Sequence, residues 1–428
     1  MFQLSARSGA FLRLMSGAVG VQVMMSASNF LVGLLLIRRT SDAEYGYYIL
    51  MSTAVLLSTT VQGSFIQPPM IIRLTRSDRT ARANLIGGLY RDQSRLVPLI
   101  AVLTAALAVA LLLTGSLNLE IATLLVAGTA AIIMTLYREF FRMVLFAYRR
   151  PNDVLRSDSV YCLLLVGGAA AATLTSYAAA AAAFSMSMAA LVGRWRLSQT
   201  LWRHEPWNPD APPGMLREIA HQGAWSAFGS GVHWLFSQGY SYLVAALLDV
   251  KAVAAVAATR LLIMPVSLLS TGIGTLMLPT VSKWAHDHQA STVLRRLVLF
   301  SLALAGAACC YLVVMWWSRD WIFTHILHKS FGDRDLLLFL WCGIAVVTVL
   351  RDQMLYFLVT RGRFQQSSTL TLVSAILSLS ISYTAMHRIG VIGALIGLLA
   401  GESFNVLGIV AFSLREARRS PGSVASAA

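Results

Sequence analysis

Three arginines inside long apolar segments are the residues of this sequence best placed to do chemistry. Arg260 lies about eight residues into one such segment, and Arg138-Glu139 and Arg351-Asp352 are adjacent charge pairs in two others. A charge at the centre of a bilayer costs about 2.5–3.5 kcal/mol on insertion scales, so a charge retained there is a candidate functional residue. A guanidinium group binds phosphate or carboxylate oxygens through two parallel hydrogen bonds. These arginines therefore indicate anion binding or ion pairing.

The segments that position these residues are long enough to cross a membrane. Of the 428 residues, 57% are hydrophobic and only 12% are charged, and the mean hydropathy is +0.67. A soluble domain has about 25% charged residues, so this composition excludes soluble globular enzymes, coiled coils and disordered tails. Apolar stretches of this length predict helices, because a helix satisfies its own backbone hydrogen bonds in hydrocarbon. We predict an all-α integral membrane protein with about twelve transmembrane helices, near residues 14–37, 46–69, 96–114, 119–147, 157–176, 177–197, 219–248, 252–278, 296–317, 335–359, 366–386 and 390–414.

The basic residues predict how the chain is oriented. The sequence has 34 Lys and Arg against 19 Asp and Glu, a net charge of +15. With a cytoplasmic N-terminus, 25 of the basic residues fall on the cytoplasmic side and 7 on the opposite side. This bias predicts both termini in the cytoplasm and explains the surplus without nucleic acid as a partner. The arginine-rich segment Arg73–Arg95 is interpreted as a cytoplasmic loop that fixes this topology, with binding of anionic lipids as its alternative role.

The second half of the chain repeats the first. The run FLVGLLL at Phe30–Leu36 recurs as YLVAALL at Tyr242–Leu248, 212 residues later. LLST recurs at the same offset, and Arg138-Glu139 recurs as Arg351-Asp352. Six spans per copy is an even number, so both copies enter the membrane from the same side and form parallel repeats, as in several transporters.

The repeat predicts three parts of the chain. The segment HEPWNPDAPPG holds four prolines and ends on glycine, so it cannot continue a helix. We predict an N-terminal six-helix lobe at residues 1–203, a cytoplasmic linker at 204–214 and a C-terminal six-helix lobe at 215–428.

Two segments carry a family resemblance. In Asn29–Tyr48 an apolar helix end is followed by a short loop and an acidic-aromatic-glycine step. In Tyr242–Lys283 an apolar helix is followed by Asp249, an alanine-rich entry to Arg260, and the string Pro279-x-x-Ser282-Lys283. With the two six-helix lobes, they resemble the polysaccharide flippase branch of the multidrug/oligosaccharidyl-lipid/polysaccharide exporter superfamily. Twelve spans fit the flippase and multidrug branches better than lipid II flippases, which usually have two more.

The resemblance implies a function. It implies a bacterial inner-membrane flippase that moves a polyprenyl-pyrophosphate-linked oligosaccharide to the periplasmic leaflet for polysaccharide biosynthesis, by alternating access. In that family the first two helices of each lobe line a central cavity, which would place Arg260 in it. No acidic residue lies three or four positions from Arg260, and an arginine without a counterion suits a pyrophosphate headgroup.

Other polar and aromatic residues extend this candidate site. Polar side chains recur at helical spacing in the first and seventh spans, where they could bond sugar hydroxyls, and a tryptophan could stack on a sugar ring. The candidate substrate-binding residues are Arg260, Gln22, Asn29, His233, Gln238 and Trp234. The alternative for each is structural: helix packing, or for Arg260 a partner on another helix.

The duplicated charges are interpreted as gating or helix–helix ion pairs. This set is Arg138, Glu139, Arg142, Arg351 and Asp352. Neighbouring helix positions point about 100° apart, so we expect neither adjacent pair to form an ideal salt bridge. Glu139 can reach Arg142 three positions on, whereas Asp352 has no such neighbour. Holding helices together and contacting the substrate are both open for these residues.

Motifs for catalysis are not found in the sequence. It has no Walker A string, and its four cysteines lack metal-ligand spacing. We expect no enzymatic activity, no cofactor and no metal, with transport driven by an ion gradient, the membrane potential or the substrate gradient. Expected partners are the lipid-linked oligosaccharide, membrane lipids, a polysaccharide polymerase and glycosyltransferases.

Two other functions also fit the sequence. One is a cation-coupled multidrug antiporter of the same superfamily, for which Glu402, Glu139 and Asp352 are the acidic candidates. The other is a membrane scaffold of a polysaccharide assembly machine that does not transport.

Overall fold

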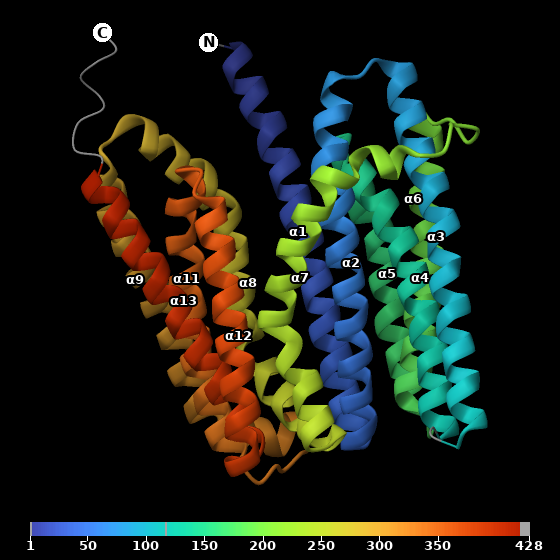
Figure 1. The fold of residues 1–428 in the computed structure, drawn as a ribbon, viewed down its shortest axis with the longest axis vertical. Coiled ribbons are helices and arrows are strands. Elements are labelled where there is room, and N and C mark those ends of the chain that lie inside the picture. Colours follow the sequence, from blue (N-terminus) through green and yellow to red (C-terminus); the bar gives the residue numbers. More distant parts are fainter. Residues whose placement is uncertain (1, 116–117, 420–428) are drawn as a thin grey trace. The chain divides into compact units, whose positions relative to one another are not determined.

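The computed structural model describes residues 2–115 and 118–419, in which every regular element is a helix (Figure 1). Twelve of the fourteen helices in these ranges have 22 residues or more. The chain divides into two compact units, Met1–Gly231 and Val232–Ala428, and the division falls inside α7 (Met215–Leu247).

The first unit is built around α4, α5 and α6. In it α4 packs against α2, α3 and α6, while α5 packs against α1 and α6. Its helices before α7 are α1 (Phe2–Arg39), α2 (Asp42–Arg76), α3 (Arg79–Leu113), α4 (Leu119–Ala147), α5 (Pro151–Ala172) and α6 (Ala178–His204).

The acidic-aromatic-glycine step of the first unit has a structural role. Ser41 caps α2 by accepting a hydrogen bond from the backbone nitrogen of Glu44 at 3.2 Å. The buried Glu44 carboxylate accepts a hydrogen bond from the backbone nitrogen of Ala179, in the first turn of α6, at 2.5 Å. A carboxylate is favourable there because the N-terminus of a helix carries partial positive charge.

The second unit is built around α11. This helix packs against α8, α9 and α13, and α12 and α13 form a close antiparallel pair. After α7 the helices are α8 (Val250–Asp287), α9 (Ala290–Trp317), α10 (Arg319–Trp321), the short π-helical η1 (Ile322–Leu327), α11 (Arg334–Thr360), α12 (Phe364–Ile389) and α13 (Val391–Arg419).

A row of glycines holds α12 and α13 together. Gly390, the one residue between them, has φ +60°, a conformation that glycine adopts without strain. Side chains at the positions of the row would overlap atoms of α12, so the two backbones approach closely. The row on α13 consists of Gly393, Gly397, Gly401 and Gly408. Asn405 of α13 adds a hydrogen bond to Ser374 of α12 at 2.9 Å.

The segment predicted as a linker, residues 204–214, is anchored to α3. The Asp92 carboxylate accepts hydrogen bonds from the backbone nitrogens of Gly214 and Leu216, each at 2.9 Å, and so caps α7. Asn208 donates to the side chain of Asn84 at 2.7 Å. Residues 204–214 therefore form an ordered strap on the first unit, and their role as the boundary between two lobes stays a prediction.

The interpretation of Arg73–Arg95 as a loop is wrong, because nearly all of it is helical. α2 continues to Arg76 and α3 starts at Arg79, with Asp78 capping it through the backbone nitrogen of Ala81 at 2.7 Å. A helix of 35 residues is about 52 Å long, whereas the hydrocarbon core is about 30 Å thick. The arginines thus lie on helix ends that are long enough to extend beyond the core.

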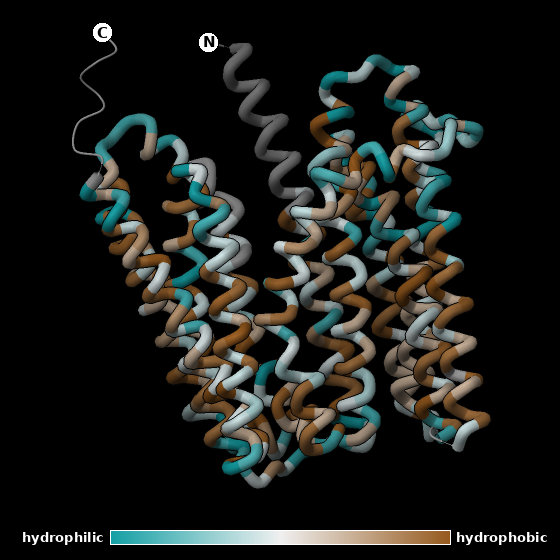
Figure 2. Tube along the Cα trace, in the orientation of Figure 1, coloured by the Kyte–Doolittle hydropathy of each residue, from teal (hydrophilic) through white to brown (hydrophobic). Residues whose placement is uncertain are grey.

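Ten helices in the described part of the chain are long and apolar enough to cross a membrane. Apolar residues follow the length of the helices in each unit, and polar residues gather at their ends and connections (Figure 2). Two long helices are not among the ten: α7, which has the predicted polar row, and α11, which holds Arg351 and Asp352. These two helices carry several of the candidate site residues, and the expectation of twelve spans stays a proposal.

Candidate functional site

A buried cluster of four charges joins α4 and α5 in the first unit. Arg138 Nη2 lies 2.6 Å from Asp158 Oδ1, and Arg142 Nε lies 3.0 Å from Asp158 Oδ2. Glu139 pairs with Arg138 at 2.8 Å and with Arg142 at 3.0 Å. Each carboxylate thus contacts both arginines, and the two positive charges balance the two negative ones. The side chains of Arg138 and Asp158 are 1% and 0% exposed, which leaves neither open to a ligand.

Neighbouring helices shape the space around Arg138. Its guanidinium carbon lies 3.6 Å from the centroid of the Tyr161 ring on α5. Gly193 of α6 faces the side chain, and a Cβ there would lie 2.9 Å from Arg138 Cδ. The absence of a side chain at Gly193 therefore makes room for the arginine between the helices.

We expect Gly193→Ala to lower the free energy of unfolding by about 1–3 kcal/mol, because the added methyl group overpacks the arginine. The check is thermal unfolding of the purified protein in detergent. Gly167→Ala on α5 is the matched control, since a Cβ at Gly167 meets no atom within 4 Å. Equal stability of the two variants would contradict the assigned role of Gly193.

A second charge cluster joins α11 and α13 in the second unit. Arg351 Nη1 lies 2.6 and 2.7 Å from the two carboxylate oxygens of Glu402, and Nη2 lies 2.8 Å from Asp352 Oδ1. Ser270 of α8 donates to Asp352 at 3.4 Å. The position that corresponds to Arg142, four residues after the first arginine, is Leu355. One arginine thus faces two carboxylates, and the balance of the first cluster is not repeated.

One prediction about these charges is wrong and one contact is found as predicted. Both adjacent pairs do form salt bridges of 2.8 Å, because the long arginine side chain bends toward its neighbour while a carboxylate on another helix holds the guanidinium. The expected contact of Glu139 with Arg142 is present at 3.0 Å. The partners on other helices, Asp158 and Glu402, were not predicted.

Arg260 of α8 has neutral hydrogen-bond partners. Its Nη1 donates to Gln238 Oε1 at 2.7 Å and to the Tyr240 hydroxyl at 3.1 Å, both on α7. The Trp341 ring centroid lies 5.5 Å from the guanidinium carbon. Within residues 2–115 and 118–419 no carboxylate pairs with Arg260, and neither its Nε nor its Nη2 donates to a protein acceptor. No described carboxylate therefore neutralises this half-buried arginine, and its Nε and Nη2 groups can donate hydrogen bonds to a ligand.

The other candidate substrate contacts are distributed over both units. Gln22 and Asn29 are exposed residues of α1 in the first unit. In the second unit, α7 carries His233, which is exposed, and Trp234, which is buried with its indole nitrogen unbonded. The structure brings Gln238 into contact with Arg260. Tyr240, the second partner of Arg260, is not among the predicted site residues.

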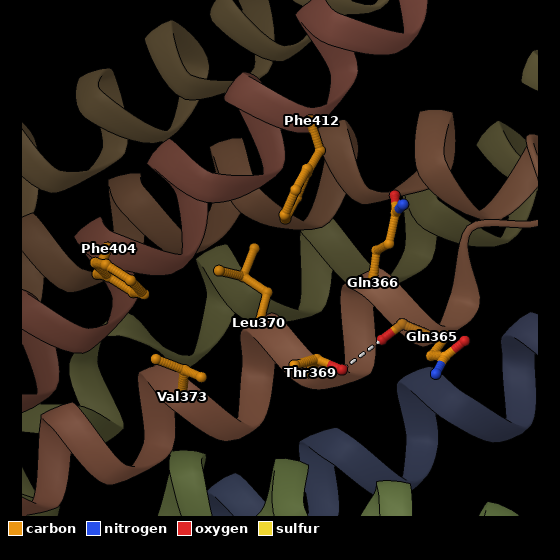
Figure 3. Close-up of a pocket in the computed structure, with 7 residues that line it drawn as sticks. All are labelled: Gln365, Gln366, Thr369, Leu370, Val373, Phe404 and Phe412. Atoms are coloured by element: carbon orange, nitrogen blue, oxygen red, sulfur yellow. Dashed lines mark hydrogen bonds between the residues drawn. The ribbon is translucent and has the colours of Figure 1, made fainter.

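A groove of about 390 Å³ lies between α12 and α13 (Figure 3). Phe404 and Phe412 project from α13, and Leu370 and Val373 from α12, so its wall is largely apolar. Gln365, Gln366 and Thr369 complete the lining. The groove carries no ionised side chain, so it can receive an apolar chain but gives no charge to bind a phosphate.

Solved structures define the class of this fold. A structure described as the inward-facing conformation of a multidrug resistance MATE family transporter of the MOP superfamily matches with a TM-score of 0.75 and 14% identity, over 95% of this chain and 96% of that chain. The lipid II flippase MurJ in an inward closed conformation matches with a TM-score of 0.74 and 10% identity, over 93% of this chain and 87% of that chain. The chain is a multi-pass integral membrane protein with the fold of this transporter superfamily.

A family model matches part of the sequence. Residues 159–324 match the family described as "Polysaccharide biosynthesis protein". The resemblance seen in the sequence, to the polysaccharide branch of the superfamily, is thereby confirmed. No protein with a curated function matches the sequence.

Proposed function

We propose that this protein is a flippase that moves a polyprenyl-pyrophosphate-linked oligosaccharide to the periplasmic leaflet of the bacterial inner membrane. It would do so by alternating access, with twelve spans in two parallel six-helix lobes and both termini in the cytoplasm. The family match supports a polysaccharide role, and the fold supports transport.

Arg260 is the observation that carries this proposal. Among the described residues Arg260 has no carboxylate partner, and its nearest neighbours along α8 are apolar or neutral. Keeping a charge there is costly, and an anionic ligand would offset that cost. Its neutral partners hold one nitrogen and leave donors for the two oxygens of a phosphate group. Gln22, Asn29, His233, Gln238 and Trp234 stay candidate contacts for the sugar.

Loss of the gene tests the proposal directly. We expect a deletion strain to accumulate lipid-linked oligosaccharide on the inner leaflet, and the intact gene to restore the wild-type level. The measurement is protection of the labelled glycan from an enzyme that acts only from the periplasmic side. An unchanged distribution of the intermediate in the deletion strain would contradict flipping, and would favour the non-transporting scaffold.

A cation-coupled antiporter for cationic drugs is the second candidate function. The observation that favours it is the surplus carboxylate around Arg351, because two acids face one arginine there. Transport assays in proteoliposomes separate the two functions. An antiporter would move an organic cation in exchange for sodium ions or protons that flow down an imposed gradient. A flippase would instead translocate a lipid pyrophosphate, and the cation would not compete.

A further inference from the structure

A pocket of about 350 Å³ between α5 and α6 of the first unit is lined by unpaired arginines. Its arginines are Arg156 of α5 and Arg196 and Arg203 of α6, and all three are exposed. His204, the last residue of α6, also lines the pocket. The guanidinium groups of the arginines form no ion pair or hydrogen bond with any residue that the structure describes. They are therefore free to bind an anion.

The remaining lining residues leave this positive charge in place. The single acid, Asp153, is already paired with Arg150 at 3.1 Å, and Arg150 also contacts Glu205 at 2.6 Å. Gln199 and Thr200 add neutral polar groups to the wall. A phosphate group is the ligand that matches such a set, because its oxygens accept several hydrogen bonds from arginines at once.

The α6 surface next to the pocket is apolar and exposed. Phe184, Met188, Leu191 and Trp195 recur every three or four residues on one side of α6, and each is at least 40% exposed. Leu163 of α5 is 73% exposed, seven residues beyond Arg156 and so on the same side of its helix. An exposed apolar surface of this kind on a spanning helix is covered by lipid chains.

Trp195 lies where the exposed apolar residues of α6 end and the arginines of the pocket begin. Tryptophan is enriched at the boundary between hydrocarbon and headgroups, and Trp195 itself lines the pocket. A phospholipid with its chains along α6 would thus hold its phosphate beside the three arginines. A soluble anion would contact the arginines but not the apolar residues of α6 next to them.

We propose that the pocket formed by Arg156, Arg196 and Arg203 binds the headgroup of an anionic phospholipid, in the leaflet at the His204 end of α6. The site is separate from Arg260, which belongs to the second unit, and it does not depend on what the protein transports.

Native mass spectrometry of the delipidated protein, titrated with phosphatidylglycerol or phosphatidylcholine, tests this site. A basic residue near the membrane surface strengthens anionic-lipid binding about fivefold, so the triple variant R156Q/R196Q/R203Q should bind the tightest phosphatidylglycerol about 100-fold more weakly. R203Q alone should weaken it about fivefold, and keeps the test usable if the triple variant does not fold. Phosphatidylcholine binding should not change.

The triple variant R295Q/R415Q/R418Q is the matched control. It removes the same charge from exposed arginines of α9 and α13 that have no described partner, and it should leave the tightest phosphatidylglycerol bound. Equal weakening in both triple variants would overturn the proposal, because binding would then follow net charge. Inorganic phosphate that displaces phosphatidylglycerol at equal concentration would also overturn it, since the site would then recognise a free anion.

Discussion

Arg260→Gln is expected to reduce transport of the lipid-linked oligosaccharide by about 10- to 100-fold at sub-saturating substrate. Hydrogen bonds that involve a charged group contribute about 1.5–3 kcal/mol, and each 1.4 kcal/mol is a factor of ten. The variant removes the charge but keeps a polar side chain, so α8 should still fold. The measurement is the initial rate of flipping in proteoliposomes at matched protein levels.

Two substitutions of its neighbours separate a role of the charge from a role in packing. Gln238→Glu keeps Arg260 but places a carboxylate where an amide oxygen now lies 2.7 Å from its Nη1. It should impair transport as strongly as Arg260→Gln, because the new ion pair neutralises the arginine. Tyr240→Phe removes only the 3.1 Å hydrogen bond and should lower the rate less than about fivefold. Wild-type transport by Gln238→Glu would remove Arg260 from the proposed mechanism.

Asp158→Asn is expected to lower the free energy of unfolding by about 3–5 kcal/mol. The carboxylate is fully buried and contacts both Arg138 and Arg142, so its loss leaves the buried Arg138 and the partly buried Arg142 against Glu139 alone. Unfolding in mixed micelles with increasing denaturing detergent measures this difference.

Restoring the charge balance should recover part of the stability. Arg142→Gln in the Asp158→Asn background leaves Arg138 and Glu139 as a balanced pair, and should recover at least about 1 kcal/mol. Glu402→Gln in the second unit also leaves a balanced pair, Arg351 and Asp352, so it should cost less than Asp158→Asn. A double variant no more stable than Asp158→Asn would show that charge balance does not stabilise this cluster.

The helices and the family resemblance could be predicted from the sequence, because long apolar segments and a repeat at constant offset are local signals. The helix ends were harder to predict. α2 and α3 continue through the arginine-rich segment because a helix persists in water when a cap such as Asp78 satisfies the backbone nitrogens of its first turn. The sequence also predicts α7 and α11, as spans near residues 219–248 and 335–359, although neither helix is among the ten candidate spans of the described chain.

The partners of the buried charges could not be predicted in the same way. Asp158 is 20 residues from Arg138, and Glu402 is 51 residues from Arg351, so no common spacing links the two pairs. Asp158 also lies at the start of a predicted span, where an acidic residue looks like part of the membrane boundary. Pairing between helices depends on how the helices pack, and a repeat of sequence does not contain that information.

The glycine row on α13 limits how the second unit can change shape. Gly393, Gly397 and Gly401 let α13 lie directly against the α12 backbone. Moving the two helices apart there would leave a void between them. Helices packed this closely shift past one another only by small amounts. In any conformational cycle of the protein we expect α12 and α13 to move as one rigid body, so that any bending would occur in other helices.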